Sequence, residues 1–297
     1  MNMSETTRSI LVFGEPATVA ETARRLESQG MHFIIINSTD EFTEELLADD
    51  LIVEAFQEVF NHADDEEEQD VNEYYDEFAE HVVPRIGDLS DDSRYDVIID
   101  CSLKSASHKS LVLAELAELY PSAIIISSTV VCTATAINAL LPLASQVVGA
   151  PLMPGYTKAT TIEIAPSLRT REITHARSRK FFEDMGFAVE LVEDRVALVF
   201  PRMIAMLINE AAYAVMEKVA QPADIDTAMK LGVNYPQGLL EWADTIGIDV
   251  VVAILDALYY EYREPRYRCC ALLRQYVRAG WLGKRTGRGF FQYLPRN

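Results

Sequence analysis

Basic residues are scarce in this chain of 297 residues, which has 26 lysines and arginines against 46 aspartates and glutamates. The formal charge of −20 at pH 7 excludes a general nucleic-acid-binding protein, because such a protein needs a basic face to displace counterions from phosphates. It also argues against adsorption of the whole protein to an anionic membrane. Apolar residues make up 49% of the chain, which is enough for a large core, so disorder of the whole chain is excluded.

Cysteines are also rare, and long apolar segments are missing. The four cysteines form no Cys-x-x-Cys pair and no spacing typical of a secreted disulfide framework. The first residues, MNMSETTRSI, lack the apolar core of a signal peptide, and no run of 18 apolar residues occurs. No DxDxDG-type loop for calcium is present, and we predict no metal site. We therefore expect a protein of the reducing cytoplasm.

The negative charge is concentrated in one segment. Residues 40–96 contain 22 acidic residues and only two basic ones, so this segment accounts for the whole net charge. The other 24 acidic and 24 basic residues cancel. Any function must therefore be compatible with a nearly neutral scaffold that carries one strongly acidic segment.

Apolar runs alternate with helical spacing over the first two thirds of the chain. The runs are too uniformly apolar to have one wet face, which is typical of parallel strands covered on both sides. We predict strands at 9–13, 32–37, 95–101, 122–127, 146–149 and 187–192, and helices at 17–29, 107–119, 198–219, 222–232, 236–246, 249–263 and 268–279. The sequence thus predicts an α/β fold, with a Rossmann-type, doubly wound, mostly parallel sheet at 1–195 and an all-helical domain at 196–297.

The turn after the first predicted strand is the place for a dinucleotide. The pattern Gly-x-Gly-x-x-Gly serves that purpose, but the sequence here is GEPATV, in which only Gly14 is kept. Pro16 lacks a backbone N–H, and Glu15 adds negative charge beside the expected phosphates. The ribose-binding acid at the end of the second strand is replaced by Asn37. Two interpretations stay open: a site for NAD, and a Rossmann-type domain that has lost its ligand.

The helical domain carries a more specific signature. Five ordered segments contribute, ADIDTAMKLG at 223–232, NYPQG at 234–238, EWADTIGID at 241–249, PRYR at 265–268 and GWLGKRTGRGFF at 280–291. This succession closely resembles the C-terminal domain of the 3-hydroxyacyl-CoA dehydrogenase family. The resemblance continues upstream through 96–101, Lys109 and 162–164, and is weakest at 14–95.

The resemblance implies a function and an assembly. The family oxidises a 3-hydroxyacyl-CoA to the 3-oxoacyl-CoA with NAD, and its helical domain forms the homodimer. The family's mechanism uses a histidine base held by a glutamate, with a serine and an asparagine that support the substrate oxygen and the nicotinamide. A neutral imidazole suits this task, because the hydroxyl must lose a proton as the hydride leaves.

Carried over residue by residue, three of these four catalytic groups are absent. The histidine position is Pro151, and the serine position falls on Val130 or Val131. The asparagine position is Pro201, whereas the glutamate is retained as Glu163. The resemblance therefore identifies a divergent member that lacks the catalytic histidine, with Glu163 as a relic or as a weak base.

The remaining candidates surround the expected cofactor. We assign cofactor-binding roles to Gly14, Asn37, Lys109 and Ser128. The alternative for Lys109 is a solvated lysine on an exposed helix face. Cys101 and Cys132 border the cleft and are expected to pack as small apolar groups. The five histidines are expected at the surface or at helix ends: His32, His62, His81, His108 and His175.

The acidic segment occupies the place of the family's helical hairpin, at about 40–83, which helps to hold CoA. Its tip at 64–70, DDEEEQD, would repel the phosphates of CoA, which makes acyl-CoA binding doubtful, although a merely solvated loop is the alternative. Two hypotheses follow. The first is an NAD-dependent oxidoreductase of this family whose activity is weak or lost, and the second is a non-catalytic dimeric binding or scaffold protein.

Overall fold

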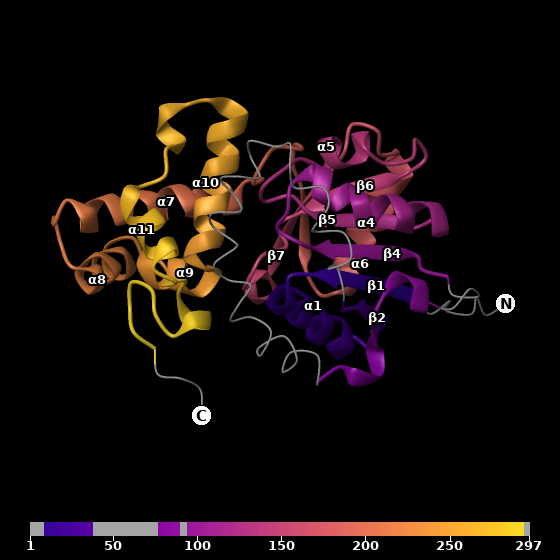
Figure 1. Cartoon of the computed structure of the whole chain (residues 1–297), viewed down its shortest axis with the longest axis horizontal. Coiled ribbons are helices and arrows are strands. Elements are labelled where there is room, and N and C mark those ends of the chain that lie inside the picture. The colour runs from indigo at the N-terminus through magenta and orange to yellow at the C-terminus, as the bar shows by residue number, and fades with distance from the viewer. Residues whose placement is uncertain (1–8, 38–76, 90–93, 294–297) are drawn as a thin grey trace. The chain divides into compact units, whose positions relative to one another are not determined.

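The computed structural model describes residues 9–37, 77–89 and 94–293 (Figure 1). The chain divides into two compact units, and the division falls between Leu198 and Val199. The first, here called the sheet unit, contains all the strands, and the second, here called the helical unit, contains helices from α7 onward. No helix in the described ranges is long and apolar enough to cross a membrane.

The sheet unit is built on one sheet of eight strands in the order β3-β2-β1-β4-β5-β6-β7-β8. Neighbouring strands are parallel except for β6 and β7. The strands are β1 (Ser9–Gly14), β2 (His32–Ile36), β3 (Val82–Val83), β4 (Val97–Cys101), β5 (Ile124–Ser128), β6 (Gln146–Ala150), β7 (Thr161–Pro166) and β8 (Ala188–Leu191). The predicted doubly wound, mostly parallel sheet is confirmed.

Helices cover both faces of this sheet. Side chains of β1 alternate between the faces, with Ile10 and Val12 in one core and Leu11 and Phe13 in the other. The first core is closed by α1 (Pro16–Ser28) and α6 (Glu172–Asp184), and the second by α4 (Ala106–Leu119) and α5 (Ala134–Ala139). The uniform apolar character of the strands therefore reflects burial on both sides.

The helical unit consists of helices that pack around a buried central one. Its helices are α7 (Phe200–Met216), α8 (Pro222–Gly232), α9 (Leu239–Ile246), α10 (Ile248–Tyr262) and α11 (Ala271–Arg278). From Ile248 to Leu255 every residue of α10 is buried. All five helices predicted for this part of the chain are confirmed, with ends that differ by three residues at most.

The sequence analysis missed strands β3 and β7 and two helices of the sheet unit, and the two helices were missed for physical reasons. Helix α6 buries Thr174 and Ser178 along with two phenylalanines, so its apolar pattern is weak. Helix α5 has only six residues. The predicted acidic hairpin at about 40–83 lies largely outside the described residues. At its end the structure describes a 3-10 turn, Ala79–His81, and strand β3.

Candidate functional site

The topological switch point of the sheet lies between β1 and β4. The helices that follow these two strands, α1 and α4, pack on opposite faces, and Gly14 pairs with Cys101 at the carboxyl ends. In open α/β sheets, ligands bind in the crevice outside the carboxyl ends at such a point. The candidate site is therefore this edge, where residues predicted from the sequence gather.

Gly14 closes the β1–α1 turn in a conformation that only glycine tolerates. Its φ is 123°, and a Cβ atom there would lie 2.3 Å from the backbone nitrogen of Ser102. Helix α1 then begins at Pro16 with no side chain capping its first turn. The Thr18 hydroxyl in that turn is buried and has no hydrogen-bond partner.

This turn fits a nucleotide pyrophosphate in part. The backbone fits, since the uncapped N–H groups of Ala17 and Thr18 point out of a helix N-terminus, a place that favours anions. Two features weaken the fit, because Pro16 has no N–H to donate and Glu15 places a carboxylate at the cap position. The residues present would hold a dinucleotide with fewer donors than the full glycine pattern.

Asn37 follows β2 directly at the same edge. Its backbone N–H donates to the carbonyl of Val83 at 3.0 Å, and the residue is exposed. A neutral amide at this position can hydrogen-bond a ribose but brings no charge to it. The predicted ribose contact of Asn37 stays a prediction.

Lys109 is buried, so the alternative of a solvated lysine is wrong. Its Nζ donates to Asp100 Oδ2 at 2.7 Å, to the Ser102 carbonyl at 2.5 Å and to Ser102 Oγ at 3.2 Å. Asp100 is fully buried and also accepts from the Ser127 hydroxyl at 2.5 Å. All three protons of the ammonium are thus donated within the protein, and a cofactor contact would require one of these bonds to break.

Ser128 ends β5 and is turned toward the protein interior. Its hydroxyl donates to the carbonyl of Leu152 at 2.7 Å, and the residue is fully buried. This bond ties β5 to the segment that follows β6. Val130 at one of the family's serine positions is also buried. A cofactor role for Ser128 stays a prediction.

Glu163 lies on β7, next to the strand that leads to Pro151. The antiparallel register pairs Val148 with Pro166 and Gly149 with Ala165. This pairing ends two residues before Pro151, which follows the end of β6 at Ala150. The role of Glu163 as the retained partner of a lost histidine at position 151 stays a prediction.

The segment from Pro151 to Lys158, here called the 151–158 loop, is packed rather than open. Leu152, Met153 and Tyr156 are buried. Helix α1 holds the loop through Glu21, which the sequence analysis did not single out. In the sequence, Glu21 is only a glutamate within a predicted helix. Nothing in that pattern indicates its contact with Gly155, which is 134 residues away.

The described histidines are exposed, stack on an aromatic ring, or contact a hydroxyl or carbonyl group nearby in the sequence. His32 is exposed, and His81 stacks on Phe33. His108 places Nδ1 2.8 Å from the hydroxyl of Ser105 at the start of α4. His175 on α6 places Nε2 3.2 Å from the carbonyl of Thr170. His62 lies outside the described residues, and within them no histidine belongs to the 151–158 loop.

The cysteines at the edge are packing groups, as predicted. Cys101 and Cys132 are buried, and burial raises the pKa of each thiol to about 12. A thiol with such a pKa is not a nucleophile near neutral pH. Among the described residues, no group of three or more His, Cys, Asp or Glu side chains could hold a metal ion.

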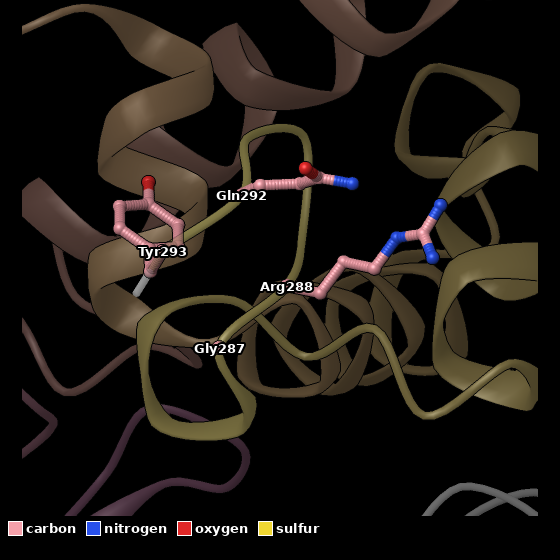
Figure 2. A pocket seen from close by; sticks show the side chains of 4 residues that line it. All are labelled: Gly287, Arg288, Gln292 and Tyr293. Atoms are coloured by element: carbon pink, nitrogen blue, oxygen red, sulfur yellow. The ribbon is translucent and has the colours of Figure 1, made fainter. Parts of the chain in front are cut away.

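One hollow lies in the helical unit, at the hairpin that follows α11 (Figure 2). It measures about 390 Å³ and is lined by Gly287, Arg288, Gln292 and Tyr293. Figure 2 shows Arg288 and Gln292 extending to one side of the hairpin and Tyr293 to the other. The Arg288 guanidinium stacks on the Trp281 ring at 3.5 Å from its centroid.

Comparison with known proteins matches both units to one family. Residues 53–195 match the NAD-binding domain of 3-hydroxyacyl-CoA dehydrogenase, and residues 198–293 match its C-terminal domain. A 3-hydroxybutyryl-CoA dehydrogenase of Bradyrhizobium diazoefficiens is 34% identical over 210 residues, which cover 70% of this chain and 71% of that protein.

Solved structures show the same fold over nearly the whole length. The structure of (S)-3-hydroxybutyryl-CoA dehydrogenase PaaH1 from Ralstonia eutropha is 25% identical with a TM-score of 0.70, covering 97% of this chain and 100% of that one. The structure of M. tuberculosis FadB2 is 24% identical with a TM-score of 0.76, covering 97% and 99%.

Proposed function

Because this chain belongs to the 3-hydroxyacyl-CoA dehydrogenase family, we propose that it binds NAD weakly and that its NAD-dependent oxidation of a 3-hydroxyacyl-CoA is weak or lost. The observation that carries the proposal is the proline at position 151, to which the family resemblance assigns the catalytic histidine. A proline side chain has no group that can accept a proton.

The reaction explains why this one position matters. The 3-hydroxyl of the substrate must lose its proton as the hydride leaves the neighbouring carbon. A positioned general base contributes a factor of about 10² to 10⁴ to such a step. Glu163 is retained, but in the family it orients the base rather than replacing it.

NAD, when bound, would accept the hydride at the carboxyl edge of the sheet. The groups of this chain that would hold it are the backbone of the β1–α1 turn at Gly14 and the first N–H groups of α1, with Asn37 at the ribose. Glu15 would oppose the phosphates of NAD, and by the family resemblance we expect the acidic residues of 40–96 to oppose those of CoA. Weak binding of both ligands is therefore the expected outcome.

The test is to restore the missing base. We expect NADH consumption with acetoacetyl-CoA to be slow in the wild type and to rise by a factor of about 10² or more in Pro151→His. Pro154→His is the matched control, because it places the same side chain three residues further along the loop. Adding Glu163→Gln to Pro151→His should reduce the gain, since the imidazole would lose its partner.

Two results would overturn the proposal. One is wild-type turnover at the level of an intact family member together with no gain from Pro151→His. The other is tight NADH binding by calorimetry, with a dissociation constant near 1 µM, which would show that Pro16 and Glu15 do not weaken the nucleotide site.

A second candidate is a non-catalytic dimeric scaffold or binding protein. Exposed apolar side chains at the ends of α7 and α8 favour it, namely Met216, Val219, Leu231 and Val233. Large exposed apolar surfaces mark protein interfaces. Sedimentation equilibrium tests the homodimer, and absence of NADH binding at millimolar concentration together with a stable dimer would select this second candidate.

A further inference from the structure

Helix α1 holds the 151–158 loop through one carboxylate. The backbone N–H of Gly155 donates to both oxygens of Glu21, at 3.1 Å to Oε1 and 2.9 Å to Oε2. The Thr157 hydroxyl donates to Oε2 at 3.4 Å. Gly155 has a φ of 86°, so the loop turns there in a conformation that presents its N–H to the helix.

A second contact lies one residue further along both elements. Tyr156 Oη lies 2.8 Å from Thr22 Oγ1. The Thr22 hydroxyl gives its proton to the Thr18 carbonyl at 2.7 Å, so Tyr156 is the donor in this bond. Both residues are buried, and this contact carries no charge that changes near neutral pH. The loop is therefore held by one contact that can titrate, to Glu21, and by one that cannot, to Thr22.

The surroundings of Glu21 shift the pKa of its carboxyl upward. Partial burial raises the pKa of the Glu21 carboxyl above its usual value, against the lowering effect of the Gly155 N–H. Among the described residues, two cations also act on it and lower its pKa, Lys158 from the loop and Arg24 from α1. Arg24 is itself engaged by Glu77, with Nη2 2.6 Å from Oε2.

We propose that Glu21 is a positioning residue that fixes the 151–158 loop on α1 while it is ionised and loosens it when it is protonated. A hydrogen bond to a carboxylate is about twice as strong as one to a neutral acceptor, so protonation weakens the bond from Gly155. Helix α1 begins at the β1–α1 turn, where we expect the nucleotide, and its Glu21 holds the 151–158 loop, which we take as the substrate side. The same helix therefore positions the nucleotide side and the substrate side of the site. The inference rests on the proposed function only in taking this loop as the substrate side.

The experiment follows amide hydrogen exchange of a peptide that covers 151–158, expressed as protection relative to the free peptide at each pH. In the wild type we expect protection to fall about tenfold from pH 8 to pH 5, because the ionised form holds the loop and is lost as the pH falls. Glu21→Gln should show the low protection at both pH values. Glu27→Gln is the matched control, since it removes an exposed carboxylate of the same helix and should behave like the wild type.

Tyr156→Phe distinguishes the contact with Thr22 from the contact with Glu21. It removes the uncharged contact with Thr22, so protection should fall at every pH while the step between pH 8 and pH 5 remains. A step of unchanged size in Glu21→Gln, or no step in the wild type, would overturn the proposal. These readouts need neither NADH nor turnover, so failure of the proposed dehydrogenase function would leave them unaffected.

Discussion

The sheet unit and the helical unit both bury aspartates, but they satisfy these carboxylates in different ways. In the sheet unit, Asp100 is met by side chains, with the ammonium of Lys109 and the hydroxyls of Ser102 and Ser127 around it. In the helical unit, Asp226 and Asp244 are met mainly by backbone N–H groups. Asp100 therefore relies on a charge pair, whereas Asp226 and Asp244 rely on the backbone around them. The buried Asp249 of the helical unit also has a charge pair, with Arg285 at 2.7 Å.

The hydrogen bonds from backbone N–H groups to these aspartates depend on nearby glycines. Asp226 accepts from the N–H groups of Leu240 and Glu241, at 2.8 and 2.9 Å. A Cβ atom on Gly238, just before them, would lie 2.1 Å from the Asp226 carboxyl carbon. The same relation joins Asp244 to the hairpin, where a Cβ on Gly289 would lie 2.0 Å from an Asp244 oxygen.

The difference explains which sequence segments are recognisable. The helical signature at 223–249 and 280–291 contains the glycines and aspartates of these contacts, so it reports the fold. At the carboxyl edge of the sheet, the residues can change while the loops stay tied by other bonds, as Ser128 and Glu21 show. The fold of the helical unit and the chemistry of the edge therefore depend on different sets of residues.

The largest effect is expected from breaking the charge pair. Lys109→Met should lower the free energy of unfolding of the sheet unit by about 3–5 kcal/mol, because it leaves Asp100 buried without a counter-charge. Urea unfolding followed by far-UV circular dichroism measures it. Both tryptophans, Trp242 and Trp281, lie in the helical unit, so their fluorescence reports separately whether that unit is affected.

The double variant Lys109→Met with Asp100→Asn is the control. It removes both charges, and most of the lost stability should return, since the penalty comes from the unpaired carboxylate. If the double variant is as unstable as Lys109→Met alone, the packing of the lysine stem, rather than charge, holds this part of the edge.

A smaller effect is expected from removing a backbone-bonded carboxylate. Asp244→Ala takes the acceptor from the N–H groups of Phe290 and Phe291 and from the Tyr293 hydroxyl, at 2.9, 2.9 and 3.0 Å. Water can reach part of this hairpin, so we expect a loss of about 2–3 kcal/mol in the helical unit. Tryptophan fluorescence during urea unfolding measures it.

The matched control is a surface carboxylate of the same helix. Glu241 lies 3.9 Å from Lys284 in an exposed pair, so Glu241→Gln should change stability by less than about 0.5 kcal/mol. Equal effects of the two substitutions would mean that the hairpin does not depend on its bonds to Asp244.

The sequence was sufficient for the elements whose stability is local or periodic. The strand at 97–101 and the helix at 248–262 are apolar throughout or regularly patterned, and the prediction found both. Helix α6 was missed because its buried face includes threonine and serine. The family assignment followed from the glycine and aspartate spacing of the helical unit.

The contacts that shape the site were not predictable in the same way. The sequence pattern of a helix is the same whether one of its lysines is solvated or buried. Lys109 is buried because Asp100 on β4 lies where it can pair with the ammonium group. Likewise, the bond from Gly155 to Glu21 joins residues 134 positions apart. Such pairings arise from tertiary packing, on which local propensity has no bearing.

The smallest effect concerns how the two units end their helices. In the sheet unit, α1 and α6 are followed by left-handed glycines, Gly30 and Gly186. In the helical unit, α11 is likewise followed by Gly280, whereas α7 is followed by Lys218 with a φ of 61°. Lys218→Gly should raise the free energy of unfolding of the helical unit by about 0.5–1 kcal/mol, because an L-residue is strained in this conformation. Lys230→Gly within α8 should instead lower it by about 1 kcal/mol. Tryptophan fluorescence measures both, and a loss of stability in both variants would show that Lys218 makes contacts worth more than its strain.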